Sequence, residues 1–269
     1  MGLADLRLCR SLLFVPASNP RAVAKARGLD ADMVILDLED AVAEEDKASA
    51  RIAAVAAAAE GFGERPVAIR VNAASTPHYG EDVVAVRRAA VDYIVLAKAE
   101  SAKQVADAAW LMGKPVLAMI ETPRGVIDAA AIAPAARALI AGTNDLGAAL
   151  GLPPEGGRRG LTYALQRIVL AARAGGAVAF DGVYNKLEAD EGLRAECEEG
   201  RLFGFDGKSV IHPVQIETVN RAFGPTEEEL EAARRLVAAA TGGAERHDGR
   251  MIEALHVEQA RAVIAKARH

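Results

Sequence analysis

The chain has 269 residues, of which 51% are hydrophobic and 4% aromatic, and its formal net charge at pH 7 is −5. A negative net charge and few aromatic residues argue against nucleic-acid binding. No apolar run reaches the ~18 residues of a membrane span. Two cysteines, Cys9 and Cys197, are too few for a disulfide framework, and the first residues lack a secretion signal, so we expect reduced thiols in a cytoplasmic protein.

Eight short apolar segments, rich in β-branched residues, are typical of buried parallel strands. They are residues 11–16, 33–39, 66–72, 93–98, 115–121, 137–143, 177–183 and 205–211. The helical segments that follow them are residues 19–29, 46–61, 80–90, 101–113, 122–133, 162–176, 190–204 and 213–224. This alternation predicts a TIM (β/α)₈ barrel. A doubly wound open sheet is the alternative, but the turn PASNPRA after the first segment lacks the glycines of a phosphate-binding turn.

Two more helical stretches follow the eighth unit. Residues 224–243 begin with a capping box formed by Thr226 and Glu229, and residues 251–267 follow a polar linker. We therefore expect a catalytic barrel domain over residues 1–224 and a C-terminal helical extension over residues 225–269. The extension is either a packing appendage or a lid over an active site.

The strongest candidates for chemistry are Glu121 and Asp145, which end two consecutive strand segments. In a parallel barrel, functional groups gather at the C-terminal ends of the strands. Two carboxylates in one space repel each other unless a cation or a proton intervenes. Oxygen ligands without His or Cys favour Mg²⁺ or Mn²⁺ over Zn²⁺. The alternative is that either residue only caps the helix that follows it.

Arg70 lies inside the apolar segment VAIRVN, so its guanidinium requires a carboxylate or an anionic ligand. It either clamps a carboxylate or thioester oxygen of a substrate or forms an internal ion pair with Asp37 or Glu39. Those two carboxylates lie on one strand face and need partners such as Arg70, Lys98 or Lys208. A structural network and direct catalysis are both open for them.

Several other polar residues lie near strand ends. Asp40 is a candidate cap for the following helix. Lys98 and Lys208 raise the possibility of a Schiff-base aldolase, but we favour charge balance for the carboxylates, because a metal-dependent site needs no imine. His212, before Pro213, is either a base or a loop residue with satisfied hydrogen bonds.

Seven segments, in this order, resemble the citrate lyase β-subunit-like proteins of the HpcH/HpaI aldolase superfamily, which are related to malyl-CoA and citramalyl-CoA lyases. They are RSLLFVPASNPRAVAKA, VILDLEDAV, AIRVN, IVLAKAES, AMIETPRGV, GTNDL and GFDGKSVIHPVQI. The resemblance implies a TIM barrel that binds Mg²⁺ and breaks or forms a C–C bond. The substrates that it implies are β-hydroxyacyl thioesters of CoA or of an acyl carrier protein.

The resemblance also implies roles for individual residues. By motif position, Glu121 and Asp145 correspond to the metal-binding carboxylates, and Arg70 corresponds to the substrate-contacting arginine. The residues that fall where relatives hold CoA are Phe14, Arg21 and Lys25.

In these relatives the C-terminal segment closes over the active site of a neighbouring subunit, in a trimer or hexamer, and supplies an aspartate from a Gly-x-Met-Ile-Asp motif. Here the motif ends in Glu253, whose carboxylate is longer by about one methylene, and the resemblance implies this residue as the catalytic base. A second departure is YNKLEADEGL, residues 184–193, where relatives have an Asp-rich stretch. By the resemblance, both differences lie in segments that face the substrate.

The sequence therefore indicates a Mg²⁺-dependent lyase that cleaves a short β-hydroxyacyl-CoA, of the citramalyl-CoA or malyl-CoA type, to acetyl-CoA and an α-keto acid. Three alternatives stay open: a citryl-carrier lyase subunit, a CoA-independent aldolase of hydroxy keto acids, and a protein that binds acyl-CoA or keto acid without turnover. We expect a homo-oligomer with exchanged lids and neither nucleic-acid nor membrane partners.

Overall fold

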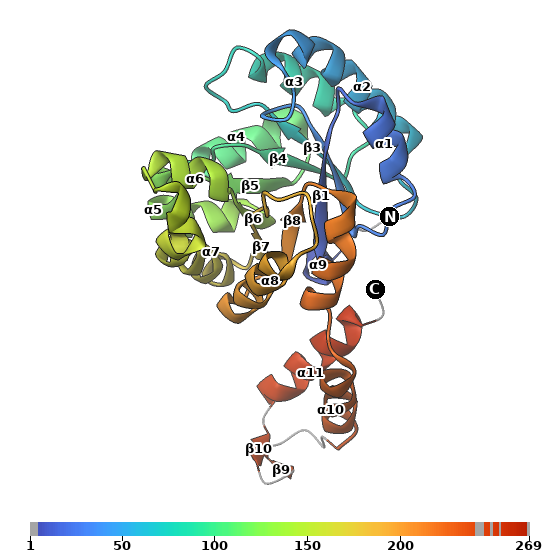
Figure 1. Cartoon of the computed structure of the whole chain (residues 1–269), viewed down its shortest axis with the longest axis vertical. Coiled ribbons are helices and arrows are strands. Elements are labelled where there is room, and N and C mark those ends of the chain that lie inside the picture. The colour runs from blue at the N-terminus through green and yellow to red at the C-terminus, as the bar shows by residue number, and fades with distance from the viewer. Residues whose placement is uncertain (1–4, 240–244, 248–249, 253, 268–269) are drawn as a thin grey trace.

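The computed structural model describes residues 5–239, 245–247, 250–252 and 254–267. Within them, eight parallel strands pair in chain order and the last pairs with the first, which closes a barrel (Figure 1). The strands are β1 (Ser11–Pro16), β2 (Met33–Asp37), β3 (Val67–Val71), β4 (Tyr93–Leu96), β5 (Val116–Ile120), β6 (Ala138–Ala141), β7 (Val178–Asp181) and β8 (Gly207–Val210). The predicted TIM barrel is confirmed.

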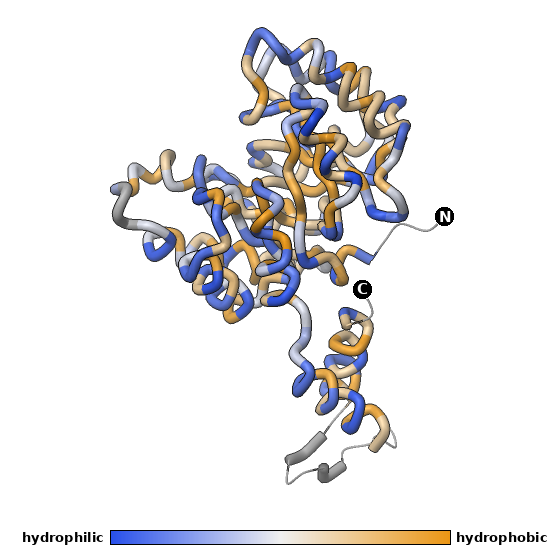
Figure 2. Tube along the Cα trace, turned by 45° about the vertical axis from the view of Figure 1, so that its right-hand side comes forward, coloured by the Kyte–Doolittle hydropathy of each residue, from blue (hydrophilic) through white to orange (hydrophobic). Residues whose placement is uncertain are grey.

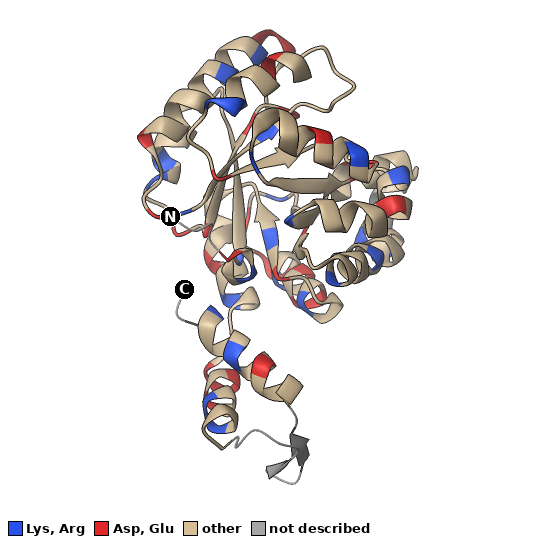
Figure 3. Ribbon diagram, turned by 180° about the vertical axis from the view of Figure 1, so that it is seen from behind, with Lys and Arg blue, Asp and Glu red and all other residues tan. Residues whose placement is uncertain are grey.

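Helices cover the outside of the barrel. They are α1 (Pro20–Ala26), α2 (Lys47–Glu60), α3 (Tyr79–Arg87), α4 (Ala102–Met112), α5 (Pro123–Ile132), α6 (Thr143–Ala149), α7 (Thr162–Gly175), α8 (Glu191–Phe203) and α9 (Ile216–Phe223). Side chains cap α1 and α4 at their N-termini: Asn19 accepts a hydrogen bond from the amide of Ala22, and Ser101 accepts one from the amide of Gln104. Lysines, arginines and acidic residues are interspersed over these helices (Figure 3), as is typical of solvated helix faces.

Alternation along the strands builds two buried layers. Leu12 and Phe14 of β1 point into the barrel, whereas Leu13 and Val15 pack against the surrounding helices. The central strands are accordingly the most apolar part of the trace (Figure 2). The same alternation continues into the polar residues, because Asp37 follows the inward-facing Ile35 at a spacing of two. It therefore aims charged groups at the barrel axis where the strands end.

The C-terminal extension projects away from the barrel (Figure 1). Its elements are α10 (Glu227–Ala239), β9 (Glu245–His247), β10 (Arg250–Ile252) and α11 (Ala254–Lys266). The capping box is confirmed: Thr226 and Glu229 exchange hydrogen bonds of 2.8 and 3.1 Å between their backbone amides and side chains. Between α10 and α11, where the sequence predicts a polar linker, β9 and β10 pair antiparallel.

The extension meets the barrel at the end where the strands begin. Gly224, just before α10, lies beside Arg10, which precedes β1. At the other end of the extension, Lys266 Nζ donates a hydrogen bond of 2.5 Å to the carbonyl of Asp206, which precedes β8. The extension therefore leaves from the side opposite to the C-terminal strand ends. No helix among the described residues is long and apolar enough to span a membrane.

Candidate active site

A cavity of about 290 Å³ opens at the C-terminal ends of the strands. Its lining residues are Phe14, Pro16, Asp37, Asp40, Ala41, Arg70, Met119, Glu121, Ala141, Gly142, Thr143, Asn144, Asp145, Val183, Ser209 and Ile211. A larger hollow of about 660 Å³ lies at the opposite end, between the barrel and the extension, and contains none of these groups. Chemistry belongs to the smaller cavity, because the strand-end charges converge there.

Arg70 projects into the cavity from β3 and is held by Asp37 on β2. The register pairs these two residues directly, and the carboxylate accepts two hydrogen bonds of 2.6 Å from Nε and Nη2. The guanidinium also lies over the ring of Phe14, 5.2 Å from its centroid. Burial lowers the pKa of Arg70, but the charge of Asp37 and its hydrogen bonds, together with the charges of Glu39 and Asp40, outweigh burial and raise it. The Arg70 charge is therefore permanent and its fork is fixed in orientation.

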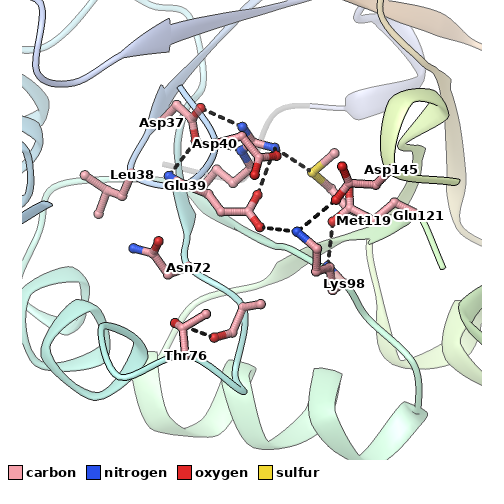
Figure 4. A network of polar contacts seen from close by, with 12 residues as sticks. Asp37, Leu38, Glu39, Asp40, Asn72, Thr76, Lys98, Met119, Glu121 and Asp145 are labelled. Carbon is pink, nitrogen blue, oxygen red and sulfur yellow. Dashed lines mark hydrogen bonds and ion pairs between the residues drawn. The ribbon is translucent and has the colours of Figure 1, made fainter. Parts of the chain in front are cut away.

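The third nitrogen of the guanidinium has looser contacts. Nη1 lies 3.0 Å from Glu39 Oε2 without a well-aligned hydrogen bond, 3.4 Å from Asp40 and 3.6 Å from the sulfur of Met119. Figure 4 shows these groups around one space. The prediction that Asp40 caps a helix is wrong, since α2 begins seven residues later and Asp40 instead faces the guanidinium. Nη1 is thus the donor that a ligand oxygen can engage most easily.

Lys98 connects this group to the other side of the cavity. Its ammonium lies 2.8 Å from Glu39 Oε1 and 2.8 Å from Asp145 Oδ2 (Figure 4). Although burial favours the neutral amine, the hydrogen bonds to Asp145 and Glu39 raise the pKa of Lys98. Lys98 balances the carboxylates, as the sequence-based interpretation holds. Its φ of 50° is left-handed, a conformation that costs a non-glycine residue about 1–3 kcal/mol and is concentrated at functional sites.

Glu121 follows β5 and is 2% exposed. Burial, followed by the neighbouring charge of Glu39, raises the pKa of Glu121 to about 7. Its Oε1 accepts a hydrogen bond of 2.7 Å from the backbone amide of Lys98. The capping alternative fails for this residue, because Thr122 is the cap of α5. A Cβ atom at Gly142 would overlap the Glu121 side chain, so glycine there makes room for the carboxylate.

Asp145 lies in the first turn of α6, and this helix is absent from the sequence prediction. The strand β6 ends at Ala141, and α6 begins at Thr143 after the glycine. Gly142 is the N-cap residue of α6, and the Asp145 carboxylate lies 2.8 Å from the Lys98 ammonium. Asp145 lines the cavity and is about a third exposed. Asp145 therefore reaches the cavity that Glu121 also lines from the first turn of a helix rather than from a strand end.

The two carboxylates fit a hard divalent cation. Both present oxygen ligands to one cavity, and the buried charge of Glu121 is stabilised when a cation is close. Mg²⁺ is usually held by one or two carboxylates, with waters and substrate completing its octahedron. No group of three or more His, Cys, Asp or Glu residues suited to a metal occurs among the described residues.

Lys208 does not belong to this group. It is fully buried, but its ammonium lies 3.2 Å from Asp181 and 3.2 Å from Glu196, on the side of β8 that faces α8. The neighbouring Ser209 lines the cavity, so alternation turns Lys208 outward. The expectation that Lys208 balances Asp37 or Glu39 is therefore wrong.

The remaining candidates lie further out. His212 caps a short 3₁₀ turn, where its Nδ1 accepts a hydrogen bond of 3.4 Å from the amide of Val214, so the structure favours its loop-residue interpretation. Phe14 lines the cavity, whereas Arg21 and Lys25 are exposed on α1 and do not. Glu253 lies outside the described residues.

Lys47 supports the site and was missed by sequence reasoning. It is buried, and its ammonium donates to the carbonyls of Leu38 and Glu39 and to the side chain of Asn72, at 2.7–2.8 Å. These bonds hold the loop that carries Glu39. The sequence does contain a signal for this role. A lysine at the first position of a helix is unfavourable next to the helix dipole, which indicates that its ammonium has a specific partner elsewhere.

Two family models match the chain. The model of HpcH/HpaI aldolase/citrate lyase matches residues 10–213, and the model of the C–C bond lyases of the TIM-barrel fold matches residues 160–269.

Curated relatives cover almost the whole chain. A Cereibacter sphaeroides protein named (3S)-malyl-CoA thioesterase is 43% identical, over 96% of this chain and 94% of its own length. The citrate lyase subunit beta of Leuconostoc mesenteroides subsp. cremoris is 37% identical, over 87% of this chain and 82% of its own length. Among solved structures, CitE of Mycobacterium tuberculosis in complex with magnesium, acetoacetate and coenzyme A is 36% identical, with a TM-score of 0.81, and covers 98% of this chain and 100% of its own.

Proposed function

The chain belongs to the HpcH/HpaI aldolase/citrate lyase family, and on this premise we propose that it is a Mg²⁺-dependent lyase of short β-hydroxyacyl-CoA thioesters. The substrates are of the malyl-CoA or citramalyl-CoA type, and the products are acetyl-CoA and an α-keto acid. The observation that carries the proposal is the convergence of Glu121, Asp145 and Arg70 on one cavity. Support for the ligands comes from the similar CitE protein, which was solved with magnesium and coenzyme A.

In this mechanism Glu121 and Asp145 hold the metal. Mg²⁺ held there would supply Lewis-acid stabilisation of negative charge on the half of the substrate that becomes the keto acid. Gly142 and the amide of Lys98 fix the Glu121 carboxylate in place.

Arg70 serves the thioester half of the substrate. When the hydroxyl loses its proton, the oxygen forms the carbonyl of the keto acid and the C–C bond breaks. The electron pair of the C–C bond moves toward the thioester carbonyl oxygen and forms an enolate. Nη1, which has only loose contacts, donates to that oxygen and stabilises the developing charge. Asp37 keeps the fork in place, so little reorganisation is needed during the reaction. Return of the proton taken from the hydroxyl to the enolate carbon then gives acetyl-CoA.

We assign the removal of the hydroxyl proton to Glu253 of a neighbouring subunit, in a trimer or hexamer. The course of the extension supports exchange between subunits, because α10 and α11 leave the barrel at the end opposite to the cavity. The strands β9 and β10 lie at the far end of the extension (Figure 1). We place CoA beside α1, along Phe14, Arg21 and Lys25.

Hydrolysis of the same thioester is a second candidate function. It is favoured by the 43% identity to a relative named (3S)-malyl-CoA thioesterase. Both reactions need a bound β-hydroxyacyl-CoA with a polarised thioester carbonyl, and they differ in whether the C–C bond or the C–S bond breaks. The Glu253 side chain is longer than the aspartate of the family motif, and this offers one reason why hydrolysis could replace C–C cleavage. A displaced carboxylate can activate water instead of the substrate hydroxyl.

Product analysis separates the candidates. The protein is incubated with Mg²⁺ and either (3S)-malyl-CoA or (S)-citramalyl-CoA. The lyase yields acetyl-CoA with glyoxylate or pyruvate, whereas the thioesterase yields free CoA with malate or citramalate. Turnover of neither substrate by Mg²⁺-loaded protein contradicts both. A CoA-independent aldolase is tested in parallel by thermal shift with free CoA, which stabilises the protein only if a CoA site exists.

A further inference from the structure

Lys98 contacts both carboxylates of the proposed metal pair, and no role in the reaction has been assigned to it so far. We propose that Lys98 is the internal counter-ion of this site: its ammonium competes with a divalent cation for Asp145 and is retained by Glu39 when the cation is bound. The proposal rests on the Mg²⁺ site of the preceding section and deepens it. It makes Lys98 a positioning residue that sets metal affinity.

The first observation is the double use of one residue. The backbone amide of Lys98 donates to Glu121 Oε1 at 2.7 Å, while its ammonium lies 2.8 Å from Asp145 Oδ2. Among the described residues, Lys98 is the one non-glycine residue with a positive φ. This left-handed turn directs the amide toward one carboxylate and the side chain toward the other. Strained backbone of this kind persists where the surrounding contacts enforce it.

The second observation is the position of Glu39. Its Oε1 also lies 2.8 Å from the Lys98 ammonium, so the ammonium has two carboxylates within reach at the same time. A Mg²⁺ ion binds carboxylate oxygen at about 2.0–2.1 Å, and an ammonium on the same oxygen would then face a doubly charged cation at close range. Lys98 can give up its ion pair with Asp145 and still keep the one with Glu39.

The third observation links the metal side to Arg70. Glu39 Oε2 lies 3.0 Å from Arg70 Nη1, and burial raises the pKa of Glu39. Glu39 therefore stands between two cations, Lys98 and Arg70. When the ammonium moves fully onto Glu39, that carboxylate is drawn toward Lys98 and leaves Nη1 freer to donate to a substrate oxygen. Metal binding and substrate binding are then coupled through Glu39.

The test measures Mg²⁺ affinity without turnover. Lys98→Met keeps the length of the stem and the backbone geometry but removes the charge. We expect its Mg²⁺ Kd, measured by calorimetry, to be at least about tenfold lower than that of the wild type, since a competing charge in direct contact is gone. After EDTA treatment its Tm should fall, because the carboxylates lose their counter-ion. Lys98→Arg, which keeps the charge, should bind Mg²⁺ with a Kd close to that of the wild type. Lys103→Met removes a lysine that pairs with Asp107 on the surface of α4 and should change neither quantity.

Glu39→Gln tests the second half of the proposal. Without the Glu39 charge, the Lys98 ammonium is held mainly by Asp145 and competes more strongly with Mg²⁺ for it. The Mg²⁺ Kd should therefore rise. In a Lys98→Met background the same change should have a smaller effect, because no ammonium is left to be retained. An equal effect in both backgrounds would mean that Glu39 acts only through its charge, and the retention step would be wrong.

The outcomes distinguish this proposal from the metal assignment. If the wild type does not bind Mg²⁺ at millimolar concentration, both fail. If the wild type binds Mg²⁺ and a folded Lys98→Met protein binds it equally or more weakly, the counter-ion role of Lys98 is overturned while the metal site stands. If Lys98→Met does not fold, Lys98→Gln replaces it under the same criteria.

Discussion

Gly142 offers a sharp perturbation of the proposed metal site. A Cβ atom placed there would overlap both the Cβ and the carboxylate Oε2 of Glu121. The backbone of Gly142 has φ −96°, which any residue adopts, so Gly142→Ala introduces no backbone strain. Its effect comes from the displacement of the Glu121 side chain and of the backbone that carries it.

The magnitude follows from the packing. The Cβ of Glu121 is attached directly to the backbone and cannot swing aside, and the side chain is 2% exposed. Overpacking of this kind costs about 1–3 kcal/mol, which corresponds to about 2–4 °C in Tm per kcal/mol for a protein near this size. Mg²⁺ tolerates little distortion, and the loss of support for a metal ligand typically weakens binding by about 10–100-fold.

The assay compares Gly142→Ala with Gly147→Ala. Gly147 lies in the same helix, and a Cβ atom there meets nothing within 4 Å, so alanine should stabilise the protein by about 0.5–1 kcal/mol through helix propensity. Mg²⁺ titration by calorimetry and thermal unfolding with and without Mg²⁺ are measured for both. If Gly142→Ala binds Mg²⁺ as tightly as Gly147→Ala does, Glu121 is not a ligand held by this contact.

Three further predictions follow from the described contacts. Arg70→Met leaves the buried charge of Asp37 without its cationic partner, with only the backbone amides of Glu39 and Ala41 donating to it, and should lower the free energy of unfolding by about 3–5 kcal/mol in urea titrations; a loss below about 1 kcal/mol contradicts a buried ion pair. Burial raises the pKa of Cys9 to about 12 and that of Cys197 to about 11, so at pH 8 neither is a thiolate, and both should resist a disulfide reagent until guanidinium unfolds the chain. Thr226→Ala removes half of a capping box and should cost about 1 kcal/mol in the same urea titrations, with no change in Mg²⁺ affinity.

The barrel itself could be predicted because its strands carry a strong local signal. Buried parallel strands read as continuous β-branched runs, and each of the eight runs contains an observed strand. The short helix α6 gave no such signal: it has seven residues, one of them glycine, and too few turns to show an apolar period. Asp145 was therefore expected at a strand end, although its place beside the cavity was anticipated.

The direction of individual side chains was harder to predict than their location. The prediction treated Lys98 and Lys208 alike, yet one faces the cavity carboxylates and the other packs against α8. For Lys208 the alternation of β8 decides the matter, and attention to Ser209 as the inward neighbour would have shown it. The direction of the Lys98 side chain depends on its left-handed backbone conformation, and no residue pattern indicates such a conformation in a lysine.

The central claim is Mg²⁺-dependent cleavage of a C–C bond by the Glu121 and Asp145 site. The most direct measurement follows (3S)-malyl-CoA by NMR with Mg²⁺ present, for the wild type and for Glu121→Gln. We predict glyoxylate and acetyl-CoA in equal amounts from the wild type, and from Glu121→Gln neither. Malate and free CoA without glyoxylate, or undiminished turnover by Glu121→Gln, would contradict the claim.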